Sequence, residues 1–387
     1  MNILHIAPYY PSLNAVHAGG RAMGKEIETL EMLNHSVVKL SFVQKKYDYD
    51  LYSKEHTERD ECVDLSLKRK IKNILCNLQI PVYFATRKDR EFYKKMCMLI
   101  EKNKIDAIHA EYSSMLLYVK KIKKKYPKIK FVCVLHDVTV QSYLRKEISE
   151  TNYLKKIIYK MEALRIRKFE NKLLRECDEV LTFSDKDQKL LHNIYQISSR
   201  CINTYFDLDN TLKIKKNITR VEDGFFSICF LGQMGRTENI EAAIRLINIV
   251  RKINFDNKRL YIIGANPPKS LLEYSSEKVI ITGYIEDVDK FIKEKCDIAC
   301  FPLINGAGIK IKVLECMALG IPVITNEIGA EGIDESGQVI LLAESNEEFE
   351  KLIHPYSNEK GIKCSDYINQ RFGWEKTVRV LENIYRG

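Results

Sequence analysis

The sequence of 387 residues lacks the features that define several classes of protein. No apolar run approaches the ~18–20 residues of a membrane span. The first residues, MNILHIAPYYPS, lack the cationic start and the small-residue cleavage site of a signal peptide. The eleven cysteines form no CxxC pair, which argues against a zinc site or a disulfide framework. These absences predict a cytoplasmic protein whose cysteines pack inside apolar segments.

Motifs for two ligand classes are missing as well. No zinc-finger, RNP-like or basic-zipper pattern occurs, so nucleic acid is not an expected partner. The glycine fingerprint GxGxxG of dinucleotide-binding folds is also absent, which weakens an oxidoreductase interpretation. What remains is the composition of a globular protein, with 45% hydrophobic and 29% charged residues.

The charge is distributed unevenly along the chain. Residues 1–216 hold 41 Lys+Arg and 27 Asp+Glu, whereas the remainder holds 21 and 25, so the net charges of +14 and −4 sum to +10. The length suits two α/β domains of ordinary size, and the charge asymmetry predicts that the two domains have different partners. The basic half could meet nucleic acid, anionic lipid or an acceptor that carries a diphosphate.

Residues 301–333 carry the most informative pattern, FPLINGAGIKIKVLECMALGIPVITNEIGAEGI. They predict a glycine-containing turn, a helix over 310–319 and a strand over 321–325. A turn that opens a helix offers free N–H groups and a positive dipole end, which is an anion site. Lys310 and Lys312 in the first turn favour a phosphate there, and Glu315 follows one turn after Lys312. The alternative is a capped surface helix with an ordinary Lys–Glu pair.

This segment resembles the nucleotide-sugar-binding segment of GT-B glycosyltransferases, in particular the retaining family 4 group. The resemblance implies that Glu315 holds the donor ribose and that Gly306, Gly308, Lys310 and Lys312 lie at the donor phosphates. Many relatives carry a further glutamate at the position of Ala307, close to the sugar ring. A branch with the pattern GxGxxxKxxE shares the replacement.

Two more segments match this family. A strand over 2–7 leads to the glycine pair Gly19 and Gly20 and then to a helix over 22–33; in the family this loop borders the donor phosphate, and the alternative is a tight turn for packing. The strand over 131–135 ends at His136 and Asp137, and the resemblance places such a pair beside the donor sugar in a catalytic position. The alternative is a His–Asp capping pair.

One family feature is altered. Gly232 ends the first strand of the second domain, and many relatives follow it with an arginine and, six residues after the glycine, a lysine that bind phosphate. Here Gln233 and Glu238 occupy those positions, so we expect Lys310 and Lys312 to supply the charge. The three D-x-D patterns, at 48–50, 185–187 and 207–209, fall in a polar loop, at a helix start and in a linker. We therefore expect neither a metal nor a cofactor.

The predicted domains are 1–206, together with a C-terminal helix 369–387 that returns to it, and 222–366. The resemblance implies two Rossmann-like domains that face each other across a cleft. Residues 44–64 are predicted to form a long loop. Residues 153–176 predict a long helix with an apolar stripe, which either packs on the core or lies on an anionic membrane surface.

These patterns predict transfer of a sugar from a nucleotide-diphosphate sugar to a glycan or lipid-diphosphate-linked acceptor. The resemblance implies retention of anomeric configuration, a hexosyltransferase type and a place in polysaccharide assembly at the inner face of a cell membrane. Two alternatives stay open: a nucleotide-sugar epimerase on the same scaffold, and a GT-B partner subunit without catalysis.

Overall fold

A computed structural model describes residues 1–387 except 205–207, 255, 307, 357 and 387. The chain divides into two compact units, one of Met1–Tyr205 with Trp374–Gly387 and one of Phe206–Gly373. Three positions used in the sequence analysis lie outside the described residues: Phe206 at the end of the first predicted domain, Ala307 in the glycine turn, and Asp207 in the third D-x-D pattern.

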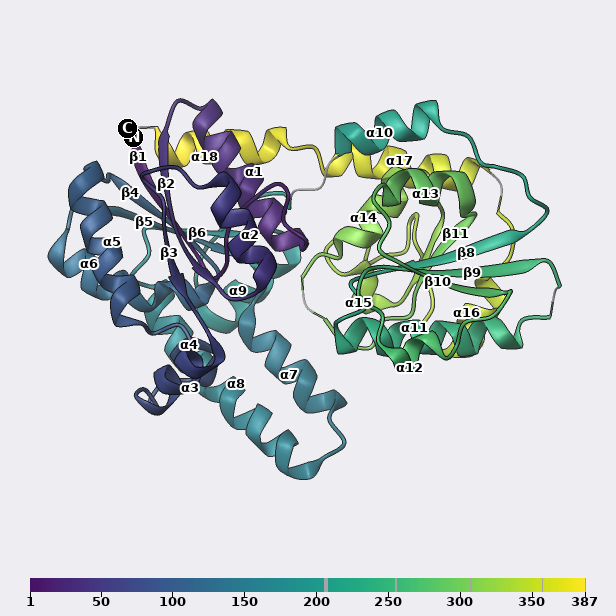
Figure 1. Ribbon diagram of the computed structural model, residues 1–387, viewed down its shortest axis with the longest axis horizontal. Helices are drawn as coiled ribbons and strands as arrows, with labels where there is room; N and C mark the ends of the chain where they lie inside the picture. The colour runs from purple at the N-terminus through teal and green to yellow at the C-terminus, as the bar shows by residue number, and fades with distance from the viewer. Residues whose placement is uncertain (205–207, 255, 307, 357, 387) are drawn as a thin grey trace. The chain divides into compact units, whose positions relative to one another are not determined.

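Unit 1 alternates strands and helices (Figure 1). Its elements are β1 (Asn2–Ala7), α1 (Ala18–Met32), β2 (Ser36–Val43), α2 (Lys46–Glu55), β3 (Glu61–Asp64), α3 (Leu67–Leu75), α4 (Val82–Ala85), α5 (Arg90–Asn103), β4 (Ala107–Glu111), the 3-10 helix η1 (Ser113–Tyr118), α6 (Val119–Lys125), β5 (Lys130–Leu135), α7 (Thr139–Ser149), α8 (Tyr153–Leu174), β6 (Glu179–Thr182), α9 (Asp185–Tyr195), β7 (Arg200–Cys201) and α18 (Glu375–Tyr385).

The unit 1 sheet has seven strands in the order β3-β2-β1-β4-β5-β6-β7, and all neighbours pair in parallel. Chain order reverses between β1 and β4, and open α/β sheets bind ligands at the carboxyl ends of the strands at such a point. The register pairs His5 on β1 with His109 on β4. Because paired residues of neighbouring strands face the same side, this register brings the two imidazoles together.

Unit 2 repeats the design (Figure 1). Its elements are α10 (Leu208–Asn217), β8 (Phe226–Leu231), α11 (Thr237–Lys252), β9 (Lys258–Ile263), α12 (Lys269–Leu272), β10 (Val279–Gly283), α13 (Val288–Lys295), β11 (Ile298–Phe301), α14 (Ile311–Ala318), β12 (Val323–Thr325), α15 (Glu327–Ala330), β13 (Leu341–Leu342), α16 (Asn346–Leu352) and α17 (Asn358–Arg371).

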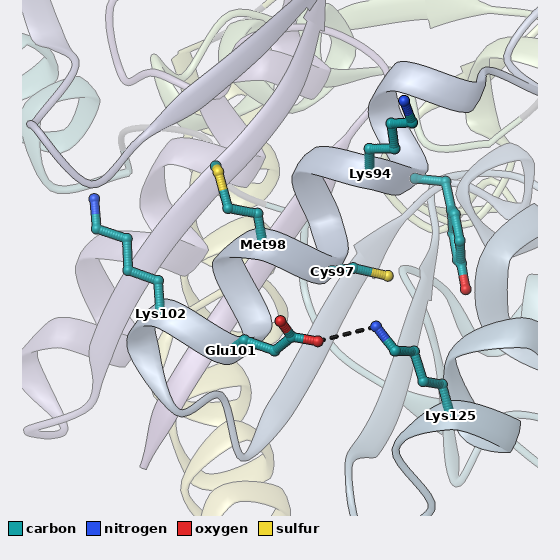
Figure 2. A pocket seen from close by; sticks show the side chains of 7 residues that line it. Lys94, Cys97, Met98, Glu101, Lys102 and Lys125 are labelled. Atoms are coloured by element: carbon teal, nitrogen blue, oxygen red, sulfur yellow. Dashed lines mark hydrogen bonds and ion pairs between the residues drawn. The ribbon is translucent and has the colours of Figure 1, made fainter.

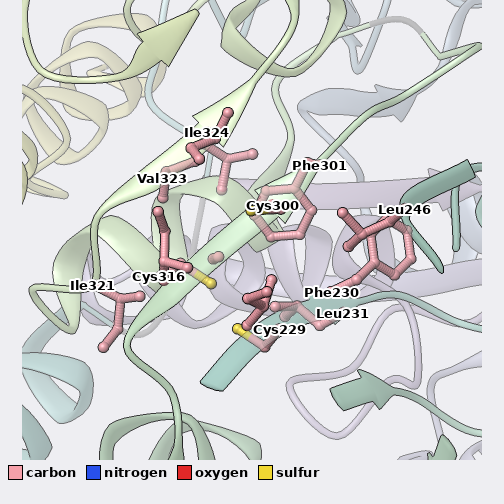
Figure 3. Packing of buried hydrophobic residues seen from close by; sticks show 14 of the residues in the cluster. Cys229, Phe230, Leu231, Leu246, Cys300, Phe301, Cys316, Ile321, Val323 and Ile324 are labelled. Carbon is pink, nitrogen blue, oxygen red and sulfur yellow. The ribbon is translucent and has the colours of Figure 1, made fainter. Parts of the chain in front are cut away.

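The six unit 2 strands run in parallel in the order β10-β9-β8-β11-β12-β13, and chain order reverses between β8 and β11. Helices α13, α14 and α17 cover one face of the sheet, and α11 and α16 the other (Figure 1). Strands buried on both faces need continuous apolar runs, and these strands have them. Figure 3 shows this core, in which Phe230, Phe301 and Ile324 pack with the thiols of Cys229 and Cys316. All eleven cysteines are free.

The prediction of a long loop over residues 44–64 is wrong, because α2 and β3 occupy most of it. Asp48 in the first turn of α2 accepts hydrogen bonds from the backbone N–H groups of Gln44 and Lys45, which satisfies the start of the helix. Lys39 on β2 forms an ion pair with the buried carboxylate of Asp60 at 3.3 Å, next to β3. Tertiary contacts therefore order a segment whose polar composition is typical of a loop.

The last helix lies in unit 1, but residues 369–373 of the predicted returning segment 369–387 belong to unit 2, where α17 ends at Arg371. Helix α18 packs against α1, and the hydroxyl of Tyr385 lies 2.7 Å from Nδ1 of His109. Lys130 on β5 donates to the carbonyl of Ile384, and Trp374 donates to Thr29 on α1. These bonds connect the end of the chain to the strands and the first helix of unit 1.

Replacing Gly264 with alanine is expected to lower the free energy of unfolding by about 2–5 kcal/mol, because a Cβ there would lie 1.8 Å from the carbonyl oxygen of Gly232. The φ of Gly264 is 151°, outside the range that L residues favour. Gly283→Ala is the matched control, since its φ is 70° but nothing lies within 4 Å of the added Cβ. Urea unfolding should show a clearly smaller decrease in the free energy of unfolding for the control. Equal decreases for the two variants would contradict the steric explanation.

Candidate functional site: the carboxyl ends of the two sheets

In unit 2, four predicted donor-binding residues gather at the switch point between β8 and β11. Gly232 follows β8, and its N–H donates to the carbonyl of Ile263 at the end of β9. The glycine turn after β11 contains Gly306 and Gly308, whose φ angles of 140° and 71° suit glycine. Helix α14 follows this turn and carries Lys312. The structure therefore places the predicted residues at the sheet edge where such folds bind ligands.

Lys312 is the central side chain of this edge. Its Nζ donates to Oδ1 of Asn239 at 3.1 Å, near the start of α11. It also lies 4.6 Å from the ring centroid of Phe230 on β8 and 5.4 Å from that of Phe301 on β11. Burial, and then the nearby charge of Lys310, lower the pKa of Lys312 to about 7. A lysine whose charged form is destabilised in this way by burial and by a second cation is typical of a site that receives an anion.

Lys310 has a different environment. It is the residue before α14, and its Nζ donates to the carbonyl oxygen of Gly308. A carboxylate oxygen of the buried Glu331 lies 3.5 Å from this Nζ. The charge of Lys310 is thus balanced by protein carboxylate, whereas Lys312 has an amide partner. Lys310 therefore stabilises the glycine turn, in addition to any contact it makes with phosphate.

Glu315 is half-buried on α14, one turn beyond Lys312. The structure adds no contact that assigns it to a ribose, and that role stays a prediction. Arg236 and Glu238 at the start of α11 are both exposed and lie 4.0 Å apart. The position that carries a lysine in many relatives is thus an exposed acid here, and Lys312 reaches the same helix end from α14.

In unit 1, the glycine pair lies inside a helix and not before it. Helix α1 begins at Ala18, four residues earlier than predicted, because Nδ1 of His17 accepts a hydrogen bond from the N–H of Gly20 at 2.9 Å. A Cβ on Gly19 would lie 2.4 Å from the hydroxyl of Tyr112 and 3.6 Å from Nδ1 of His136. Gly19 is therefore required for close approach of these rings, and the structure brings it together with His136.

His136 follows β5 and is nearly enclosed. Its Nε2 lies 2.7 Å from Oε2 of Glu111, at the end of β4, and its ring stacks on Tyr112 at a centroid distance of 3.9 Å. Since a carboxylate only accepts, Nε2 carries the proton, and Nδ1 faces the glycine of α1 as an acceptor when the ring is neutral. Asp137 lies beside it and accepts weakly from the hydroxyl of Ser142 at 3.4 Å.

Glu111 is the functional candidate that sequence reasoning missed. Its Oε1 lies 3.0 Å from Nε2 of His5 and 3.3 Å from Nε2 of His109, and the latter nitrogen lies 3.0 Å from Oε2 of Glu26. All four side chains are fully buried. The available signal was ionisable residues within the apolar strand segments NILHIA and AIHAE. Such residues inside buried strands need partners, and here they are one another's.

Burial and mutual contacts set the ionisation of this cluster. Burial alone would raise the pKa of Glu111, but hydrogen bonds from His109, His136 and His5 hold it well below its usual value. Burial alone would lower the pKa of His109, but Tyr385, Glu111 and Glu26 raise it well above its usual value. Burial, with repulsion from Glu111, raises the pKa of Glu26 to about 7. The cluster therefore contains an ionised Glu111 beside a protonated His109.

Within the described part of the chain, one group of side chains has ligand atoms close enough together to hold a metal ion: His5, His109 and Glu111. All three are already hydrogen-bonded within the cluster. The expectation of a metal-independent protein stays a prediction.

A pocket on unit 1 lies away from these residues. Figure 2 shows it between α5 and α6, where Glu101 and Lys125 form an ion pair at 2.9 Å beside Met98 and Lys102. Glu101 and Lys102 occupy the last turn of α5, before β4 begins, so the pocket lies toward the amino ends of the strands. It contains no predicted site residue.

Comparison with known proteins agrees with this architecture. Residues 226–356 match the family model described as Glycosyl transferases group 1. The whole chain superposes on sucrose-phosphate synthase from Thermosynechococcus elongatus with a TM-score of 0.71 at 14% identity, covering 100% of this chain and 98% of that one. A glycosyltransferase from Rickettsia africae gives 0.67 at 16% identity, with 100% and 97% covered.

A third similar structure is Alr3699/HepE of Anabaena in complex with UDP, with a TM-score of 0.67 at 13% identity and 99% of each chain covered. No curated protein gives a significant sequence match. The structural likeness establishes the fold, and the family model covers the unit that holds Gly232, Lys310, Lys312 and Glu315. The chain thus has the GT-B fold, and residues 226–356 of unit 2 match the group 1 glycosyl transferases.

Proposed function

We propose that this protein transfers a sugar from a nucleotide-diphosphate sugar to a glycan or lipid-diphosphate-linked acceptor. We further propose that it is a retaining hexosyltransferase of the family 4 type, that it needs no metal, and that it acts in assembly of a bacterial-type surface polysaccharide or glycan. Nucleotide-sugar transfer agrees with the family of unit 2 and with a neighbour whose structure contains UDP.

One observation carries the proposal: the ammonium group of Lys312 lies at the switch point of unit 2, on the rings of Phe230 and Phe301. Helices α11 and α14 both begin at this edge, and each directs N–H groups and a positive dipole end toward it. A diphosphate bound here would meet a cation and two helix starts. Glu315, one turn along α14, is proposed to accept from the ribose hydroxyls.

The same groups would serve the reaction. Departure of a nucleoside diphosphate leaves negative charge on the phosphate next to the sugar, and fixed donors that favour this charge lower the barrier. Lys312 and the N–H groups around Gly306 and Gly308 are proposed to take this role in place of a metal ion. His136, with Nδ1 as an acceptor beside Gly19, is proposed to bind a hydroxyl of the donor sugar, with Asp137 next to it.

The test is a panel of nucleotide sugars, assayed by calorimetry against the purified protein and then incubated with and without candidate acceptors. We expect one donor to bind and to be consumed only when an acceptor is present, with the anomeric configuration retained in the product. An epimerised donor in the absence of acceptor would support the epimerase. Failure of every nucleotide sugar to bind would contradict the proposal and favour a partner subunit without catalysis.

A further inference from the structure

Helix α8 directs its apolar stripe away from the rest of unit 1. The stripe consists of Tyr153, Leu154, Ile157, Ile158, Met161 and Leu164, and these side chains are between 38% and 75% exposed. They recur at spacings of three and four residues, so they occupy one side of the helix. The opposite side contains Ala163 and Ile166, which are buried in unit 1. Of the two interpretations of this stripe, packing on the core is therefore wrong for this part of the helix.

Helix α3 has a second exposed stripe. Leu67, Ile71 and Leu75 follow one another at intervals of four residues and are 73%, 49% and 65% exposed, and Leu78 after the helix is 64% exposed. The end of this segment lies against α8, because Arg165 donates to the carbonyl of Leu78 at 2.7 Å and to that of Ile80 at 2.8 Å. Leu78, at the end of the α3 stripe, therefore lies close to Arg165, the neighbour in sequence of Leu164 at the end of the α8 stripe, and we call the two stripes together the apolar patch.

Helix α7 extends beside α8 in a hairpin, as Figure 1 shows for unit 1. Ile148 on α7 is 78% exposed and lies near the tip of this hairpin, close in sequence to Tyr153. Single exposed apolar residues are common, but so many on adjacent helices mark an interaction surface.

Basic residues flank the patch. Lys155, Lys156 and Lys160 on α8 and Lys68 and Lys72 on α3 are exposed. The two acids of α8 do not offset this charge at the surface, because both are buried: Glu162 accepts from the N–H of Val82, and Glu170 accepts from the hydroxyl of Tyr195. Helix α3 contains no acid. The exposed faces of α3 and α8 therefore combine apolar side chains with an excess of positive charge, while Glu147 and Glu150 lie beside Ile148 near the tip of the hairpin.

We propose that the apolar patch docks unit 1 on the surface of an anionic lipid bilayer. Helices of this kind lie in the interface with the apolar side among the acyl chains, while flanking lysines reach the headgroups. Among the described helices, none is long and apolar enough to cross a membrane, so the contact is peripheral. A protein partner would need a matching acidic and apolar surface, whereas an anionic bilayer offers both properties over the whole length of the patch.

The proposal is tested by co-sedimentation with phosphatidylcholine vesicles and with vesicles that also contain phosphatidylglycerol. We expect binding to the anionic vesicles, weaker binding at high salt, and little binding to phosphatidylcholine alone. Replacing Lys155, Lys156 and Lys160 with alanine should weaken binding on the order of 100-fold. The double variant Leu154→Glu and Ile158→Glu should not bind at all, because it places carboxylates on the apolar side.

The matched control is Ile362→Glu on α17, an exposed apolar position of unit 2 that should leave vesicle binding unchanged. Thermal unfolding of all variants should match the wild type, since every substituted side chain is exposed. No binding to anionic vesicles at low salt would overturn the proposal. So would a dimer in solution that dissociates in the Leu154→Glu and Ile158→Glu variant, because the patch would then be a contact between two copies. Vesicle binding is measured without donor or acceptor, so its failure and that of the sugar-transfer proposal are distinguishable.

Discussion

Replacing Lys312 with methionine is expected to weaken binding of the cognate nucleotide sugar by roughly 10- to 100-fold, the value of one or two hydrogen bonds between a charged donor and a phosphate. Methionine keeps an apolar stem beside the rings of Phe230 and Phe301, so the site should stay packed. Because a partly buried cation is removed, stability should not fall. Isothermal calorimetry and urea unfolding measure the two quantities.

The control for this variant is Lys293→Met on α13, another partly buried lysine of unit 2 whose pKa is lowered by burial. It does not lie at the switch point, and its nucleotide-sugar affinity should equal that of the wild type. If the Lys312→Met variant and the wild type bind the nucleotide sugar with equal affinity, Lys312 does not contribute to the donor site.

The lowered pKa of Lys312 adds a dependence on pH. With a pKa of about 7, the free protein holds this amine mostly neutral at pH 8 and mostly charged at pH 6. A bound diphosphate favours the charged form, so binding above pH 7 should take up a proton, and affinity should decline as pH rises. Calorimetry in buffers of different ionisation enthalpy measures the uptake. A nucleotide sugar is the proper ligand, because a terminal phosphate titrates near pH 6 itself.

Replacing Glu111 with glutamine is expected to lower the free energy of unfolding by about 3–5 kcal/mol, because it removes the buried carboxylate to which His5, His109 and His136 all hydrogen-bond. His136 would lose its anionic acceptor in the same change, so turnover of the proposed reaction should fall as well. Urea unfolding at neutral pH measures the first effect. Glu101→Gln, in the exposed ion pair with Lys125, should leave stability close to the wild-type value.

The sign of the pH dependence follows from the lowered pKa of Glu111. A carboxyl group with a depressed pKa in the folded protein contributes its full stability above its ordinary value of 4.5 and loses it as pH falls through the folded value. The wild type and the Glu111→Gln variant should therefore differ in free energy of unfolding by an amount to which the titration of Glu111 adds no pH dependence above pH 4.5. This difference should shrink in acid. A difference that grows in acid would contradict an ionised Glu111.

The strands and the anion-binding turn were predictable because their signals are local. Buried parallel strands require short apolar runs, and glycines with positive φ followed by a lysine-bearing helix require the pattern of residues 306–312. The fold followed from these elements and from the resemblance of three segments to GT-B proteins. Glycine disfavours helix interiors, so the glycine pair predicts a loop, and the cap from His17 overrides that preference.

Contacts between residues distant in sequence were decided by the tertiary structure alone. The register of β1 with β4 makes His5 and His109 neighbours, and only the adjacent strand ends bring Glu111 to His136. The burial of Glu26 and Tyr385 against them depends on where α1 and α18 pack.

The apolar stripe of α8 shows both what periodicity determines and what only the tertiary structure decides. Periodicity by itself determined that residues 153–164 form a helix with one apolar side. It could not determine which way that side faces, because a stripe that packs on a core and a stripe that meets a partner have the same spacing. The structure decided this by burying Ala163 and Ile166 and leaving Leu154, Ile158 and Met161 exposed, since a helix on the surface of unit 1 buries only the side that packs against the unit.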